Sequence, residues 1–326
     1  MQSFLDPAIL FFVFGMLAGL LKSNLEIPPQ ISRFLSLYLL MALGLKGGFA
    51  LAKSGLTQDV LVSLGAALTM AVLVPVLGYV MLRRFLNGFD AAAIAATYGS
   101  VSAVTFITAV QYLDNQGIAF GAHMAAAMAL MESPAIVLAV LLANHARQSA
   151  HAAAGPLTTA TTGNAPLGRI LHEALTDGAQ LLLVGAMLIG VLTGESGQAA
   201  MKPFSVDLFK GMLAFFLLDM GLLAARNMGQ LRGQSVWLLA YALGGPPLHA
   251  GLALLLGWAL GMSVGNTALL MVLAASASYI AVPAVIRHAI PEAKPSLYFG
   301  MSLGLTFPFN ILLGIPLYLQ AAQRWL

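Results

Sequence analysis

Gly99-Ser100-Val101-Ser102-Ala103-Val104-Thr105 and Ala275-Ser276-Ala277-Ser278-Tyr279-Ile280 are short, hydroxyl-rich interruptions of otherwise hydrophobic segments. They lie 176 residues apart, so that their serines align in pairs: Ser100 with Ser276, and Ser102 with Ser278. Two further motifs recur in the same order at nearly the same spacing: Leu43-Gly44-Leu45 with Met220-Gly221-Leu222, and Pro134 with Pro308. These matches predict an internal repeat of about 175 residues. Paired interruptions of this kind are typical of a substrate site near the membrane midplane.

The composition predicts an all-α polytopic membrane protein. Hydrophobic residues make up 60% of the chain, charged residues 8%, and the mean hydropathy is +0.89, whereas soluble domains carry roughly 25% charge. A membrane helix needs about 20 apolar residues. Ten such windows are predicted: 6–22, 31–53, 58–83, 90–112, 117–144, 170–192, 206–225, 234–261, 265–289 and 295–322. The first is interpreted as a retained helix, because no small-residue cleavage site follows it.

Lys and Arg residues predict the orientation of these ten helices. If the N-terminus lies outside, the predicted cytoplasmic side carries Lys22, Arg33, Arg83, Arg84, Arg147, Arg169, Arg226, Arg232, Arg287 and Lys294. The predicted outer side carries only Lys53, Lys202, Lys210 and Arg324. The positive-inside rule favours this orientation, with both termini outside.

The predicted organisation is a 5+5 inverted repeat. Residues 1–143 form helices 1–5 and residues 169–326 form helices 6–10, in which helices 4 and 9 are broken and cross. Because five is an odd number, the second repeat enters the membrane in the opposite sense. Residues 144–168 are rich in Ala, Thr, Gly and Ser and are predicted to form a flexible cytoplasmic linker.

Several functional classes lack support in the sequence. The chain has no cysteine, and its six histidines do not have the spacing of zinc ligands. No nucleophile and base, or metal ligands, are clustered as an enzyme requires. No basic, aromatic surface suggests a nucleic-acid partner. The lipid bilayer is therefore the expected environment, and an enzyme is not expected.

Three charged residues are predicted in mid-span: Lys46, Glu132 and Asp219. Ionisable groups at that depth are costly and mark functional sites. Glu132 is interpreted as a coupling-ion ligand, the alternative being an acid that accepts hydrogen bonds from backbone amides freed near a helix break. Lys46 and Asp219 occupy equivalent helices of the repeat and are predicted to form a buried charge pair. Alternatively, each meets backbone carbonyls or water.

The two interruptions predict an anion site. A broken helix offers free N–H groups and the positive end of a half-helix dipole, which bind anions. The predicted substrate-binding residues are Ser100, Ser102, Thr105, Ser276, Ala277 and Ser278. The alternative for each hydroxyl is close helix packing or a bond to the preceding turn.

Four motifs resemble those of the sodium-dependent bicarbonate permease family (SbtA type), known from cyanobacterial carbon-concentrating transporters. Leu43-Gly44-Leu45-Lys46-Gly47-Gly48 resembles Ile-Gly-Leu-Thr-Gly-Gly, and Gly99 to Thr105 resembles Gly-Ala-Val-Ser-Gly-Ser-Thr. Met131-Glu132-Ser133-Pro134-Ala135 resembles Met-Asp-Ile-Pro-Ala. Ala274 to Pro283 resembles Ala-Ala-Ser-Ser-Ser-Asp-Ile-Ser-Gly-Pro, except that Tyr279 replaces the Asp that is the natural sodium ligand.

This resemblance covers all ten predicted helices and implies a fold, an activity and partners. It implies a gate domain of helices 1, 2, 6 and 7, a mobile core of the other six, a homotrimer and a PII-like cytoplasmic regulator. The expected function is secondary active uptake of a small anion, with bicarbonate leading, by alternating access in a bacterial inner membrane. The expected coupling ion is sodium, and the candidate residues for binding it are Glu132, Tyr279, Thr306 and Asn310.

Three alternatives to this function stay open. The first is coupling to protons through Glu132, because Tyr279 is a poor substitute for a carboxylate on a hard cation. The second is transport of another small monocarboxylate. The third is a transport-inactive membrane signalling subunit. No resident cofactor is expected in any of these cases.

Overall fold

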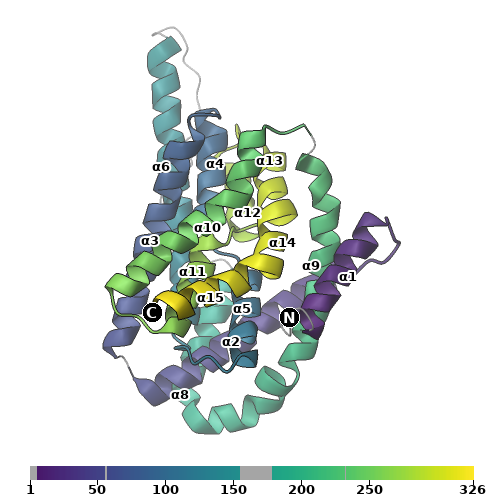
Figure 1. The fold of residues 1–326 in the computed structure, drawn as a ribbon, viewed down its shortest axis with the longest axis vertical. Coiled ribbons are helices and arrows are strands. Elements are labelled where there is room, and N and C mark those ends of the chain that lie inside the picture. The colour runs from purple at the N-terminus through teal and green to yellow at the C-terminus, as the bar shows by residue number, and fades with distance from the viewer. Residues whose placement is uncertain (1–5, 56, 155–177, 232) are drawn as a thin grey trace.

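The computed structural model describes residues 6–55, 57–154, 178–231 and 233–326, and every regular element in these ranges is helical (Figure 1). The first half contains α1 (Pro7–Leu20), α2 (Pro29–Ser54), α3 (Gln58–Leu82), α4 (Gly88–Gly99), α5 (Ala103–Asn115) and α6 (Met124–Ala154). The second half contains α8 (Gly178–Lys202), α9 (Phe209–Asn227), α10 (Val236–Ala259), α11 (Val264–Ala275), α12 (Ala281–Ala289), α13 (Pro295–Met301), α14 (Phe307–Phe309) and α15 (Ile315–Trp325). Short segments join some of them: η2 (Pro203–Asp207), η3 (Met228–Leu231), η4 (Ser302–Thr306) and η5 (Asn310–Gly314).

Seven helical segments of the described residues are long and apolar enough to cross a membrane. They are Pro29–Lys53, Gln58–Leu82, Gly88–Asn115, Met124–Asn144, Leu181–Asn227, Val236–Ala259 and Pro295–Trp325, and α1 and α11 are shorter apolar helices. The protein is therefore a polytopic helical membrane protein. The ten helices and the inverted repeat remain predictions.

The segment Leu181–Asn227 is 47 residues long and cannot be one crossing. A straight helix of that length spans about 70 Å, more than twice the hydrocarbon core. Gly194 interrupts it with φ 55° and ψ −137°, and the π-helical η2 follows. In Figure 1 the chain turns at the bottom of the view after α8 and rises again as α9. The segment thus forms two arms joined by a bend.

The predicted linker begins differently from expectation. Instead of ending near residue 143, α6 continues to Ala154, so the first eleven residues of the range 144–168 are helical. Alanine, which is frequent there, has the highest intrinsic helix propensity. Residues 155–168 lie outside the described part of the chain.

Small residues let α2 and α8 pack closely. A Cβ on Gly48 would lie 2.1 Å from the Met187 carbonyl oxygen, and one on Gly44 would lie 2.5 Å from that of Leu183. Gly44 and Gly48 are one turn apart on α2, which is the small-xxx-small pattern of membrane helix pairs. The backbones of α2 and α8 therefore touch at a face that only glycine permits.

The pair α1 and α9 uses the same device. A Cβ on Gly15 would lie 2.2 Å from the Leu218 carbonyl oxygen, and one on Gly221 would lie 2.2 Å from that of Phe12. If the repeat exchanges helix 1 with helix 6 and helix 2 with helix 7, the contact of α1 with α9 becomes the contact of α8 with α2. The predicted repeat would relate these two glycine-mediated pairs to each other.

The interrupted helices lie at the centre of the molecule. Residues 90–99 of α4 and 265–275 of α11 are buried almost throughout. The run from Ala91 to Ala96 lets neighbouring helices approach α4, and Gly99 lies against the ring of Pro75, where a Cβ would come within 2.6 Å. The break residues from Ser100 to Ser102 and from Ser276 to Tyr279 are buried in this core, whereas Ile280 is 57% exposed.

Candidate functional site

The two helix breaks predicted from the sequence are present and touch each other. Between α4 and α5 the chain is extended at Ser100 and Ser102, and between α11 and α12 it is extended at Ser276. The Ser102 N–H donates to the Ser276 hydroxyl at 2.9 Å, and the Ser278 N–H donates to the Thr97 carbonyl at 2.8 Å. Backbone groups released by one break are therefore satisfied by the other.

Ser102 is the N-cap of α5. Its hydroxyl accepts hydrogen bonds from the Thr105 N–H at 3.2 Å and from the Thr105 hydroxyl at 2.9 Å. The first helical bond of α5 runs from Phe106 N–H to the Ser102 carbonyl, so the N–H groups of Ala103 and Val104 have no acceptor within the helix. This end of α5 is the positive end of its dipole.

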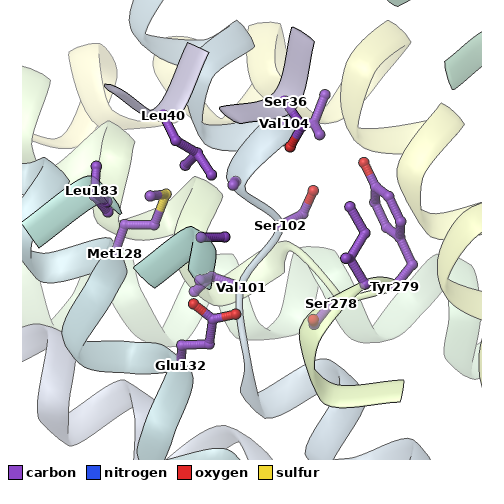
Figure 2. Close-up of a pocket in the computed structure, with 13 residues that line it drawn as sticks. Ser36, Leu40, Val101, Ser102, Val104, Met128, Glu132, Leu183, Ser278 and Tyr279 are labelled. Carbon is purple, nitrogen blue, oxygen red and sulfur yellow. The ribbon is translucent and has the colours of Figure 1, made fainter. Parts of the chain in front are cut away.

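A pocket of about 80 Å³ lies at this helix end. A water molecule needs roughly 10–15 Å³ on the same measure, so the pocket has room for an ion of a few heavy atoms. It is lined by Ser36, Leu40, Val101, Ser102, Ala103, Val104, Met128, Glu132, Ala179, Leu183, Ser278, Tyr279 and Ile280. In Figure 2 the extended segment between α4 and α5 passes through the site, with Glu132 drawn on one side and Ser278 and Tyr279 on the other.

Glu132 supplies the one charged side chain among the lining residues. It stands on α6 two residues before Pro134, which lies inside that helix. The other lining groups are hydroxyls, backbone and apolar side chains. A carboxylate in such low-dielectric surroundings interacts strongly with any ion that enters the pocket.

Tyr279 places its ring within the protein and its hydroxyl near the pocket. The ring packs edge-on against Phe307 with 5.3 Å between centroids, and the hydroxyl lies 3.6 Å from the Met220 sulfur. Its hydroxyl also interacts with Ser102. A phenol therefore occupies a position beside the break at which the resembling family carries an acid.

The structure separates the predicted substrate residues into two groups. Ser102 and Ser278 line the pocket, whereas Ser100, Thr105, Ser276 and Ala277 do not. The Ser276 hydroxyl is occupied, because it donates to the Leu273 carbonyl at 2.9 Å while accepting from Ser102. Among the described residues, the buried Ser100 hydroxyl has no hydrogen-bond partner.

Thr306 and Asn310, predicted as coupling-ion candidates, lie outside the pocket lining. The Thr306 hydroxyl donates to the Ala242 carbonyl at 2.7 Å and lies 2.6 Å from the Tyr98 hydroxyl. Asn310 donates to the Ala275 carbonyl at 2.8 Å, at the end of α11. Both side chains satisfy buried backbone groups in these positions.

The predicted pair of Lys46 and Asp219 is not formed. The Lys46 ammonium lies 4.4 Å from the centroid of the Phe209 ring, and Phe209 is ten residues from Asp219, about 15 Å along α9. Among the described residues, the Asp219 Oδ2 atom is buried without a hydrogen-bond partner. In the predicted repeat the two residues lie on equivalent helices, but α2 packs along α8 and α9 along α1, so the two side chains do not meet.

Sequence reasoning missed Ser36. It lies in the second turn of α2 and places a hydroxyl in the pocket wall (Figure 2). Ser32 and Ser36 are one helical turn apart and therefore share a face. Two hydroxyls at that spacing near the start of a hydrophobic span were the signal available in the sequence.

Comparison with known families agrees with this geometry. The profile of the Na+-dependent bicarbonate transporter superfamily matches residues 7–323. The chain belongs to this superfamily. The match includes both helix breaks, Glu132 and all pocket-lining residues. A comparison with curated proteins gave no match.

Proposed function

We propose that this superfamily member is a secondary active transporter that takes up bicarbonate together with a sodium ion by alternating access. The anion would bind at the N-terminal end of α5, to the Ser102 and Ser278 hydroxyls and the N–H groups of Ala103 and Val104. These donors are neutral, so they suit a small monovalent anion that exchanges quickly. Glu132 would serve the coupling ion.

One observation carries the proposal: anion donors and a carboxylate share a pocket of about 80 Å³. An anion and an ionised Glu132 repel each other there, because little solvent screens them. Simultaneous occupancy is favourable only when a cation binds beside the carboxylate or a proton neutralises it. This arrangement makes binding of the anion depend on a cation, which is the requirement for symport.

Sodium and a proton are the two candidates for that cation. Among the described residues, no three His, Asp or Glu side chains form a metal-binding cluster. A sodium ion would therefore rely on Glu132, the hydroxyls of Ser102, Ser278 and Tyr279, and backbone carbonyls, all of which are hard oxygen ligands. The superfamily favours sodium, whereas Tyr279 in place of an acid favours the proton alternative.

The contacts at the two ends of the molecule support the proposed topology. Asn115 donates to Asp6 at 2.6 Å, and both residues belong to the predicted outer side. Lys294 N–H donates to Asp90 at 2.8 Å, and both belong to the predicted cytoplasmic side. With the positive-inside rule, this supports outer termini in a bacterial inner membrane. A homotrimer and a PII-like regulator are proposed from the resemblance alone.

Uptake of labelled bicarbonate into proteoliposomes tests the function. The full-length protein would be measured with and without an inward sodium gradient, at two pH values. Sodium-driven uptake supports the proposal, uptake driven by a proton gradient alone supports the alternative, and no uptake under either gradient refutes transport of bicarbonate.

The double variant Ser102→Ala with Ser278→Ala tests the site. We expect it to fold and to lose at least tenfold in apparent affinity for bicarbonate, because two donors disappear without a large cavity. Ser302→Ala is the matched control, since Ser302 is buried but its hydroxyl donates to the Tyr298 carbonyl, away from the pocket. Equal affinity in the double variant and the control would remove the hydroxyls from the proposed site.

A further inference from the structure

A second and larger cavity lies along the same helices as the helix-break pocket, toward the predicted outer ends of α2 and α5. Its volume is about 480 Å³. Its inner wall includes Leu43 of α2 and Phe106 of α5, both buried, and its rim includes the exposed Lys53, Asp114 and Gln198. We call this cavity the vestibule.

The vestibule and the pocket are stacked. On α2, Leu40 lines the pocket and Leu43 lines the vestibule. On α5, Val104 lines the pocket and Phe106 lines the vestibule. Lys46 lines the vestibule six residues beyond Leu40, about 9 Å further along α2. An ion in the vestibule is therefore separated from the pocket by a thin layer of apolar side chains.

Lys46 stands in the vestibule without a close carboxylate. Within the described ranges, the one ion pair closer than 4.0 Å joins Arg147 and Glu292, at another place. The Lys46 ammonium lies over the Phe209 ring, and it interacts electrostatically with Asp114 and Lys210 at longer range. Lys53 adds a second cation to the lining, and Asp114 is its one acid. The lining side chains thus carry a net positive charge.

We propose that the vestibule is a binding site for a small monovalent anion, with Lys46 as the residue that attracts it before it reaches the pocket. A charged cleft between low-dielectric walls raises the local concentration of the opposite ion. The lysine sits at a depth where a cation is costly, and an anion in the vestibule would offset that cost. This inference deepens the proposed transport function and rests on it for the identity of the anion.

The potential in the vestibule is measurable without transport. Because the chain has no cysteine, Gln198→Cys on the rim can be labelled alone in purified protein. We compare two methanethiosulfonate reagents of similar size, one carrying a sulfonate and one a trimethylammonium group. The ratio of their rates should fall about tenfold when Lys46→Gln is added. The rate ratio should keep its parent value in Lys46→Arg, which preserves the charge. It should also keep that value in the control Lys202→Gln, since Lys202 is exposed and does not line the vestibule.

Protection identifies the ligand. Bicarbonate should slow labelling by the sulfonate reagent, relative to gluconate at the same ionic strength, and should do so only while residue 46 is basic. If phosphatidylglycerol added to the purified protein protects Gln198→Cys from the sulfonate reagent and bicarbonate does not, the site holds a lipid headgroup and the proposal is overturned. A rate ratio unchanged by Lys46→Gln also overturns it.

Kinetics separates this proposal from the proposed function. In proteoliposomes, Lys46→Gln should raise the KM for bicarbonate about tenfold and change the maximal rate less than twofold, and Lys46→Arg should restore the KM. An unchanged KM would overturn the role of Lys46 in uptake. If the parent protein transports no bicarbonate, the proposed function fails, and the labelling ratio and protection still decide whether the vestibule binds an anion.

Discussion

The backbone N–H of Ser102 donates to the hydroxyl of Ser276, 174 residues further along the chain, over 2.9 Å, and this bond joins the two helix breaks. The same Ser276 hydroxyl also donates a hydrogen bond to the Leu273 carbonyl. Ser276 thus holds the breaks together, and the neighbouring Ser102 and Ser278 keep their hydroxyls at the pocket.

Ser276→Ala should therefore destabilise the fold. The Ser102 N–H would be buried without an acceptor, which costs roughly 1–3 kcal/mol. Thermal unfolding in detergent measures the loss. Ser302→Ala should cost less, because the Ser302 hydroxyl donates only to carbonyls of its own helix and its removal strands no N–H group. Equal melting temperatures for the two variants would contradict the bridging role of Ser276.

Gly48→Ala should disrupt the packing of α2 on α8. The added Cβ would meet the Met187 carbonyl oxygen at 2.1 Å and Gly190 Cα at 2.8 Å, so the backbones must separate. We expect a loss of at least 2 kcal/mol, roughly the cost of overpacking a core, in a thermal unfolding measurement. Gly65→Ala on α3 is the matched control, because nothing lies within 4 Å of its Cβ position. Alanine there should stabilise the helix by up to about 1 kcal/mol, so destabilisation of both variants alike would argue against the close contact.

The sequence predicted the breaks and missed the partners of the charged residues, for physical reasons. Serines among small residues, between apolar runs, are a local signal, and Ser102 and Ser276 could be found from it. Which neighbour a side chain meets depends on how helices cross. Lys46 and Asp219 lie on equivalent helices of the predicted repeat, yet glycines direct α2 onto α8 and α9 onto α1. Those close contacts are readable only from the structure.

Thr306 should matter for stability because of a proline. Pro246 lies inside α10 and has no N–H to donate to the Ala242 carbonyl, four residues earlier. The Thr306 hydroxyl replaces that donor at 2.7 Å. Thr306→Val should cost roughly 1–3 kcal/mol, because it leaves the Ala242 carbonyl and the Tyr98 hydroxyl unpaired, and Thr306→Ser should cost less. The cost of Thr306→Val should shrink in a Pro246→Ala background, where the amide returns. A cost that is the same in both backgrounds would exclude this explanation.

Glu292 should make stability depend on acid pH. Both of its carboxylate oxygens accept from the Arg147 guanidinium at 2.8 Å, which lowers the pKa of Glu292 in the folded protein. A lowered folded pKa means that the pair stabilises the protein above the unfolded value of about 4.3. That contribution, less than about 1 kcal/mol for a partly exposed pair, disappears as the pH falls through the folded value.

The melting temperature of Glu292→Gln, measured between pH 3 and pH 7, checks this dependence. The variant should be less stable than the parent at pH 7 and should approach it at the acid end. Glu195→Gln removes an exposed acid from α8 and is the control. A constant difference between Glu292→Gln and the parent at all pH values would show that the ion pair contributes nothing through its charge.

Tyr279→Asp should increase the stimulation of uptake by sodium. The substitution places a carboxylate beside Ser102 and opposite Glu132 in the pocket wall, and a carboxylate is a better ligand for a hard cation than a phenol. Removing the ring also leaves a cavity against Phe307, so part of any change reflects lost packing. Tyr279→Asn creates the same cavity without the charge and separates the two effects. Initial uptake rates at increasing sodium should show a half-saturating sodium concentration several-fold lower in the Asp variant than in the Asn variant.

If the two variants respond to sodium alike, Tyr279 does not stand at the cation site, and Glu132→Gln then becomes the decisive variant. Loss of cation dependence in Glu132→Gln would place the coupling ion at Glu132 alone.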